Sequence, residues 1–376
     1  MTIRADSSDV ARSLDQFRGC LLGGAVGDAL GAAVEFQSLA EIRARFGSGG
    51  IHDYAPAYGR RGAITDDTQM TLFTAEGLIR ADDRGRDRGI AHVPSMVHRA
   101  YLRWLATQGQ SSTALTPSML DGWLYAVPAL RSRRAPGNTC LSALASGTLG
   151  TVREPINDSK GCGGIMRVAP VGLAASAAAN ASATAGPAGA DPFTLGCDLA
   201  AITHGHPSGY LAAGFFADLI ARIVRGEQLR DAVEAATATL REWPAHAECL
   251  EAVEAAVRLA ESGPPSAENV ERLGEGWVAE ESLAIALYCA LTATNFEEAV
   301  VLAVNHGGDS DSTGAIVGNI LGSLWGTRVI PARWLDGLEL RDEIEQVATD
   351  LFRHFGDPTA SPDADAPDDR DRYPSR

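Results

Sequence analysis

The sequence predicts an all-α protein, one compact domain of ten or more helices. Apolar residues recur every three or four positions along most of the chain, which places them on one face of a helix. No segment alternates apolar and polar residues over a convincing length, so β-strands are not expected. Of the 376 residues, 45% are hydrophobic and 21% are charged, which is ample material for one large core.

The expected helices follow one another along the chain. The first begins at a possible capping box, Ser13 to Gln16, and the second begins at Thr65-Asp66-Asp67-Thr68. Apolar residues spaced by four predict a later helix that ends at Gly226, and a last helix ends at Gly356. Further helical patterns cover approximately residues 231–243, 248–259, 280–291, 297–304 and 313–325.

The first helix carries a glycine at every fourth position, at Gly19, Gly23, Gly27 and Gly31. Each glycine costs a helix about 1 kcal/mol relative to alanine, so four on one face need a reason. The reason that we favour is close backbone packing against another helix in a crowded core. A membrane dimer motif is excluded because charged residues occur in the same segment.

Charge and composition exclude several classes of protein. The net charge of −16 does not suit a broad nucleic-acid backbone surface, which needs clustered basic residues. No apolar run reaches the roughly 18 residues that span a bilayer, and the N-terminus lacks an apolar signal region. Six widely spaced cysteines without a C-x-x-C pair favour reduced thiols. We expect a cytoplasmic protein, and a monomer because no heptad pattern occurs.

Three segments are expected to lie outside the helical core. Residues 1–14 would form a flexible N-terminus, so that the domain covers residues 15–356. The Ala/Gly-rich stretch 174–191 is either a linker between domains or a loop, and we favour a loop because candidate functional residues lie on both sides of it. Residues 357–376 are rich in proline and aspartate and predict a disordered acidic tail.

Two clusters of acidic and hydroxyl residues begin expected helices: Thr65-Asp66-Asp67-Thr68 and Asp309-Ser310-Asp311-Ser312. Helix capping is the simplest structural interpretation of either cluster alone. Capping needs only one such side chain, however, and a helix dipole offsets only about 1 kcal/mol of the repulsion between adjacent carboxylates. Mg²⁺ or Mn²⁺ would remove the repulsion, because hard cations prefer oxygen ligands. Together with Glu35, the clusters could hold two ions.

A glycine-rich loop with Lys160, the only lysine of the chain, lies between the clusters. Its glycines let backbone N–H groups approach an anion, and a tight turn is the structural alternative. The loop lacks the Gly-Lys-Ser/Thr ending of a Walker A motif. His204 and His206 form either a helix end or a contact to a ligand, and zinc is not expected. Metal-binding acids beside an anion-binding loop indicate a phosphorylated, hydroxyl-rich ligand.

Several segments resemble, in order, blocks of the ADP-ribosylglycohydrolases, the family of dinitrogenase reductase-activating glycohydrolase and of the ADP-ribosylarginine and ADP-ribosylserine hydrolases. They read FRGCLLGGAVGDALGAAVEF, ITDDTQMTL, KGCGGIMRVAPVGL, THGHPSGYLAAGF and NHGGDSDSTGAIVGNILG. The resemblance covers roughly residues 17–326, and TDDT together with GDSDST is its most specific part. It implies an orthogonal helical bundle with a centre of two Mg²⁺ or Mn²⁺ ions.

The resemblance also implies roles for single residues. The implied metal ligands are Thr65, Asp66, Asp67, Asp309, Asp311 and Ser312. Glu35 matches the family's acidic residue beside the distal ribose. Our own hypothesis is that Glu35, Asp67 or Asp311 assists the attacking water as general base. The segment that wraps the diphosphate and ribose of ADP-ribose corresponds to Ser159, Lys160, Gly161, Cys162, Gly163 and Gly164. His204 matches a histidine near the nucleotide end.

The implied activity is metal-dependent hydrolysis of the glycosidic bond between ADP-ribose and an acceptor. We expect an ADP-ribosylated protein side chain as acceptor and favour arginine, since Lys160 and Cys162 differ from the residues of the serine-specific relatives. Two alternatives stay open: a hydrolase of a small ADP-ribose conjugate, and a catalytically silent ADP-ribose-binding protein. The intact clusters count against the silent protein, because binding alone does not need a full metal set.

Overall fold

The computed structural model describes residues 7–176, 187–356 and 371–374. Within these residues it contains helices and no strand, which confirms the predicted fold class. The α-helices are α1 (Ser7–Gly31), α2 (Leu39–Phe46), α3 (Asp66–Arg88), α4 (Val93–Thr107), α5 (Trp123–Ala126), α6 (Asn138–Ala145), α7 (Ala169–Ala175), α8 (Pro192–Ala201), α9 (Pro207–Val224), α10 (Leu229–Arg241), α11 (Ala247–Ala260), α12 (Ala267–Glu271), α13 (Ala279–Thr292), α14 (Phe296–Val304), α15 (Ser310–Trp325), α16 (Ala332–Gly337) and α17 (Arg341–Phe355).

Short 3-10 helices complete the described secondary structure. They are η1 (Pro117–Met119), η2 (Pro128–Arg131), η3 (Cys162–Gly164), η5 (Pro187–Gly189) and η6 (Thr327–Val329). None of the helices in the described part of the chain combines the length and the apolar character that crossing a membrane requires.

The N-terminal boundary differs from the prediction. Helix α1 begins at Ser7, so Ser13 lies inside the helix and the expected capping box is wrong. The sequence from Ser8 to Ser13 contains neither proline nor glycine, and nothing in it stops the helix from extending further toward the N-terminus. The expected flexible segment is therefore wrong for residues 7–14, and residues 1–6 lie outside the described residues.

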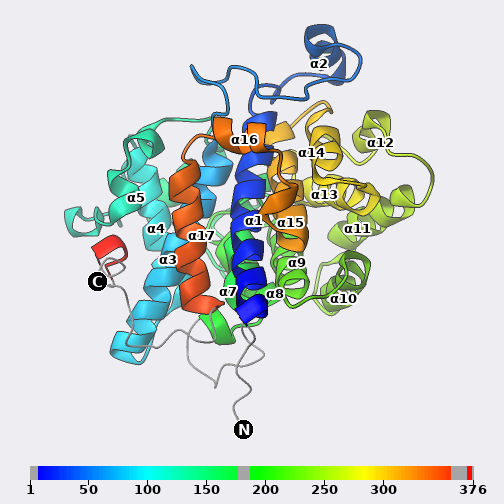
Figure 1. Cartoon of the computed structure of the whole chain (residues 1–376). Coiled ribbons are helices and arrows are strands. Elements are labelled where there is room, and N and C mark those ends of the chain that lie inside the picture. Colours follow the sequence, from blue (N-terminus) through cyan, green and yellow to red (C-terminus); the bar gives the residue numbers. More distant parts are fainter. Residues whose placement is uncertain (1–6, 177–186, 357–370, 375–376) are drawn as a thin grey trace.

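Helix α1 lies in the middle of the molecule with α15 and α17 on either side of it (Figure 1). It runs antiparallel to α15, and the two backbones touch through glycines of both helices. A methyl group at Gly23 or Gly27 would lie less than 3.0 Å from backbone atoms of Gly318 or Gly314, respectively. The expected reason for the glycine repeat is thus confirmed. This contact brings the end of α1 next to the beginning of α15.

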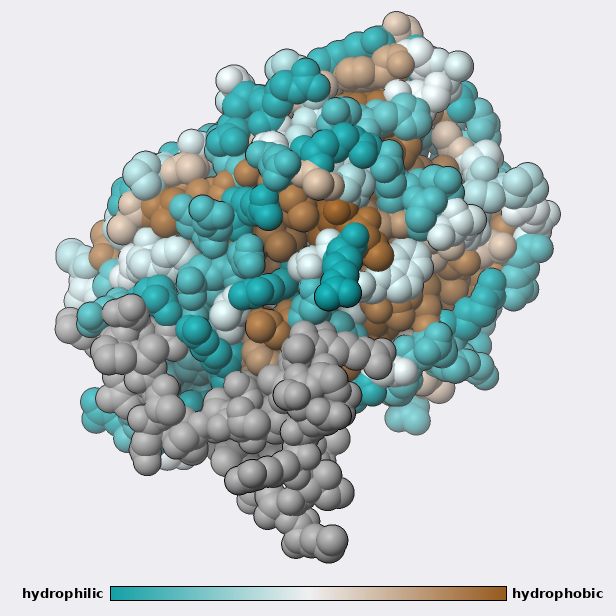
Figure 2. Space-filling view, in the orientation of Figure 1, coloured by the Kyte–Doolittle hydropathy of each residue, from teal (hydrophilic) through white to brown (hydrophobic). Residues whose placement is uncertain are grey.

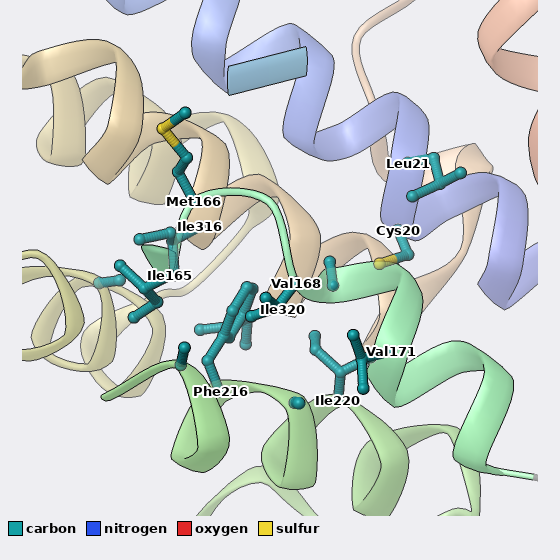
Figure 3. Packing of buried hydrophobic residues seen from close by; sticks show 14 of the residues in the cluster. Cys20, Leu21, Ile165, Met166, Val168, Val171, Phe216, Ile220, Ile316 and Ile320 are labelled. Carbon is teal, nitrogen blue, oxygen red and sulfur yellow. The ribbon is translucent and has the colours of Figure 1, made fainter. Parts of the chain in front are cut away.

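The hydrophobic core surrounds this helix pair. Figure 3 shows side chains of four helices that meet there: Cys20 and Leu21 of α1, Val171 of α7, Phe216 and Ile220 of α9, and Ile316 and Ile320 of α15. All of them are buried, and each large apolar side chain contributes about 1.5–3 kcal/mol on burial. On the face drawn in Figure 2, hydrophilic side chains cover much of the surface between smaller hydrophobic areas.

The predicted Ala/Gly-rich loop is described only in part. Ala175 ends α7, Pro187 begins a 3-10 turn and Pro192 begins α8, while residues 177–186 lie outside the described residues. Helices α7 and α8 both pack against α9. The chain on the two sides of the stretch therefore belongs to one core.

Residues 371–374 pack against the helical body. Tyr373 is 1% exposed, its hydroxyl donates a hydrogen bond of 3.0 Å to Asp350, and its ring lies edge-on to Trp123. The expectation of a disordered tail is wrong for this segment, because Tyr373 supplies both an apolar ring and a donor for a buried carboxylate. Residues 357–370 lie outside the described residues.

Candidate active site

A pocket of about 630 Å³ lies where α1 ends and where α3 and α15 begin. Most of the residues that the sequence singles out line it: Glu35, Asp66, Asp67, Gly161, Cys162, Gly163, His204, Asp309, Asp311 and Ser312. Both acidic clusters and the glycine-rich loop therefore meet in one place, although they are far apart in the sequence.

The first cluster is fixed by a buried carboxylate of α1. Asp28 accepts hydrogen bonds from the backbone N–H groups of Thr65, at 3.0 Å, and of Thr68, at 3.1 Å. Thr65 is the N-cap of α3, and its hydroxyl accepts a bond of 3.3 Å from the N–H of Asp67. Burial and then the charge of Asp311 raise the pKa of Asp28 to about 7. Asp28 thus anchors the first turn of α3 to α1.

The second cluster begins α15. Asp309 is the N-cap residue, but its side chain makes no capping hydrogen bond, so helix capping does not account for this acid. Its backbone N–H donates to the carbonyl oxygen of Glu275 at 2.8 Å. The thiol of Cys162 donates to a carboxylate oxygen of Asp309 at 2.6 Å, and burial raises the pKa of this thiol well above its usual range. The glycine-rich loop is thereby tied to the acidic cluster.

Carboxylate oxygens converge in the pocket. Glu35, Asp309 and Asp311 each offer one such oxygen, and these atoms lie within 4.8 Å of one another. Oε2 of Glu35 and the Oδ1 atoms of Asp67 and Asp311 are buried without a hydrogen-bond partner among the described residues. Buried oxygens without a donor are costly, and a hard divalent cation would satisfy them.

The pKa values agree with this interpretation. Burial, and next the charge of Asp311, raise the pKa values of Asp66, Asp67 and Asp309 well above the usual range. The same two causes raise the pKa of Glu35 to about 11. So many carboxyl groups in one buried place cannot all be ionised without positive charge. The residues present therefore fit a divalent cation.

The glycine-rich loop forms the opposite wall through η3. A methyl group at Gly163 would lie 2.9 Å from the sulfur of Cys140 and 3.0 Å from the ring of His204, so a side chain has no room there. His204 is buried, and its Nδ1 lies 2.8 Å from the hydroxyl of Thr203. Burial lowers the pKa of His204 to about 3, so its imidazole is neutral.

Four residues predicted for the site do not line the pocket: Thr65, Ser159, Lys160 and Gly164. Thr65 is the N-cap of α3, and its hydroxyl accepts the N–H of Asp67. The ammonium group of Lys160 pairs with Glu248, at 2.5 Å, and with Glu280. Because these acids belong to α11 and α13, Lys160 ties the loop to these two helices and does not line the pocket.

Part of the wall was not predicted from the sequence. Arg133 and residues 135–140 line the pocket, and so do Phe36 and Trp277. The rings of Phe36 and Trp277 are stacked, with centroids 5.2 Å apart and planes at 20°. The only sequence signals were the position of Phe36 next to Glu35 and the glycines just before Trp277.

Fold and site together define an all-helical protein with a carboxylate-lined pocket between the N-termini of two helices. The family model described as ADP-ribosylglycohydrolase matches residues 9–360. The chain belongs to the ADP-ribosylglycohydrolase family, and its relatives support a glycohydrolase enzyme.

Named relatives match over most of their length. The chain is 28% identical to ADP-ribosyl-(dinitrogen reductase) glycohydrolase of Rhodospirillum rubrum, with 88% of this chain and 92% of the relative covered. It is 25% identical to the ADP-ribosylarginine hydrolase Tri1 of Serratia proteamaculans, with 91% and 80% covered. A solved structure titled "ADP-ribosylglycohydrolase-related protein complex" aligns with a TM-score of 0.60 and 27% identity, over 92% of this chain and 99% of that one.

Proposed function

We propose that this enzyme hydrolyses the glycosidic bond between ADP-ribose and an arginine side chain of a modified protein, with two Mg²⁺ or Mn²⁺ ions in the acidic pocket. The observation that carries the proposal is the convergence of Glu35, Asp309 and Asp311, whose oxygens lie within 4.8 Å of one another. A binding protein would have no reason to bear the cost of so much buried negative charge.

The residues that would hold the ions are those of the two clusters: Thr65, Asp66, Asp67, Asp309, Asp311 and Ser312. When bound, the ions would supply positive charge that orients the ribose hydroxyls and lowers the pKa of a water molecule. Asp28 positions the first cluster through Thr65 and Thr68, and so acts on the site without lining it.

The carboxylates would also act directly in the reaction. The bond between the anomeric carbon and the arginine nitrogen breaks, the oxygen of water bonds to that carbon, and the leaving nitrogen keeps the bonding electron pair and gains a proton. Glu35, Asp67 or Asp311 would accept the proton of the attacking water. The nearby negative charges would stabilise the positive charge that develops on the sugar.

The other wall would hold the ADP part. Gly161 and Gly163 line the pocket, where the missing side chains would let a diphosphate come close to the backbone. Neutral His204 would contact the nucleotide end without adding charge. The names of the Rhodospirillum and Serratia relatives support a protein substrate and, for the second, an arginine linkage. The free, mostly buried cysteines agree with a cytoplasmic enzyme, and a monomer is its simplest form.

The experiment that tests the proposal is release of ADP-ribose from two matched peptides, one modified on arginine and one on serine. Each is incubated with Mg²⁺ or with EDTA, and the product is separated by chromatography. We expect release from the arginine peptide with Mg²⁺ only. Release from neither peptide, with hydrolysis of a small ADP-ribose conjugate, would favour the alternative substrate, and binding without any hydrolysis would favour a silent protein.

A further inference from the structure

A second pocket, of about 340 Å³, adjoins the first. Phe36 and Trp277 line both pockets, so their stacked rings form the boundary between them. Phe36 directly follows Glu35, whose carboxyl group belongs to the acidic centre. The second pocket therefore begins where the reacting end of a bound ADP-ribose would lie.

At this aromatic boundary, the backbone of Phe36 is strained. Phe36 has φ of +68°, a left-handed conformation that bulky residues rarely adopt, and its side chain is 68% exposed. Its backbone N–H donates to the carbonyl oxygen of Gly308 at 3.3 Å, which keeps the turn in place. Backbone strain and an exposed aromatic ring next to a reaction centre are typical of a ligand-binding surface.

The second pocket is also negatively charged. Glu271 and Glu275 line it and are exposed, and no basic side chain is among its lining residues. Within the described parts of the chain, neither carboxylate has a hydrogen bond or an ion pair. The backbone of Glu275 is fixed to the acidic cluster, since its carbonyl oxygen accepts the N–H of Asp309.

We propose that this second pocket binds the guanidinium group of the acceptor arginine, an inference that rests on the proposed function. A guanidinium is planar and always charged, so it stacks on aromatic rings and pairs with carboxylates. Phe36 and Trp277 supply the rings, and Glu271 and Glu275 supply the carboxylates. A serine acceptor has neither a plane nor a charge, so the pocket selects arginine over serine.

The first test uses the double variant Glu271→Gln/Glu275→Gln and, as matched control, Glu242→Gln/Glu251→Gln, two exposed glutamates outside both pockets. We expect the KM for an ADP-ribosylarginine peptide to rise about tenfold in the pocket variant, because two ion pairs are lost. Its kcat and its affinity for free ADP-ribose should match those of the control. An unchanged KM in the pocket variant would overturn the inference.

A binding measurement separates this inference from the proposed hydrolysis. N-acetylarginine amide is titrated into the ADP-ribose-bound protein by calorimetry, with the wild type, the double glutamine variant and Phe36→Leu. We expect binding to the wild type and about tenfold weaker binding to both variants. Such a result without hydrolysis of the arginine peptide would support guanidinium binding in the second pocket and refute the proposed reaction. Equal binding by all three proteins, or none by the wild type, would refute the pocket.

Discussion

Gly314 of α15 touches the backbone of Gly27 of α1 so closely that a methyl group at Gly314 would lie 2.6 Å from the carbonyl oxygen of Gly27. Asp28 follows Gly27 directly, and Asp311 lies one helical turn before Gly314. The contact therefore sets the separation of two acids that come from opposite ends of the chain. The glycines that pack the two helices therefore also position acids of the candidate site.

We predict that Gly314→Ala destabilises the protein by about 3 kcal/mol, because the added methyl group meets backbone that cannot move aside. Urea denaturation followed by circular dichroism measures this change. Gly307→Ala is the matched control, since its methyl group would meet no atom closer than 3.5 Å. Equal stability of the two variants would show that the helices separate more easily than the structure implies.

Asp311→Asn should reduce hydrolysis by about a hundredfold or more, because the variant loses one proposed anionic ligand of the cations while the side-chain volume stays the same. The variant should also lose most of the thermal stabilisation that Mg²⁺ gives the wild type. Turnover and melting temperature with and without Mg²⁺ check both statements, with Glu251→Gln as control. Full activity of Asp311→Asn would show that the carboxylate of Asp311 is not needed for the reaction.

Strong local patterns made much of this molecule predictable. The expected helix over 248–259 is α11 (Ala247–Ala260), and Asp66 and Asp67 of the first motif line one pocket with Asp309, Asp311 and Ser312 of the second. Long-range pairs carry no such local pattern, so the stacking of Phe36 on Trp277 could not be foreseen. The burial of Tyr373 was also missed, because the composition around it indicates disorder.

The stability of the metal-free protein should fall as the pH rises from 5 to 8. Burial raises the pKa of Asp28 from 3.8 to about 7 and that of Glu35 from 4.5 to about 11, so the folded state binds more protons than the unfolded chain between these values. The stabilisation that these two protonated carboxyl groups provide is present below pH 4. It is lost as the pH rises through their folded-state pKa values. Mg²⁺ should therefore raise the melting temperature more at pH 8 than at pH 5. An equal effect of Mg²⁺ at both pH values would contradict the prediction.

Tyr373→Ala should cost about 3 kcal/mol, because a buried ring is removed and Asp350 loses a donor. Tyr373→Phe keeps the ring and should cost about 1 kcal/mol, the usual value of one hydrogen bond. Guanidinium denaturation of both variants gives the two values. If neither variant differs from the wild type, the C-terminal segment does not hold this position in solution.

In the proposed reaction, cations in the acidic pocket make hydrolysis possible. Protein stripped with EDTA is dialysed and titrated with Mn²⁺, and the same samples are measured for bound metal by atomic emission and for ADP-ribose release from an arginine-modified peptide. We predict no release from the stripped protein and a return of activity that follows Mn²⁺ occupancy up to two ions per chain. Full activity of the stripped protein would show that the reaction does not need cations.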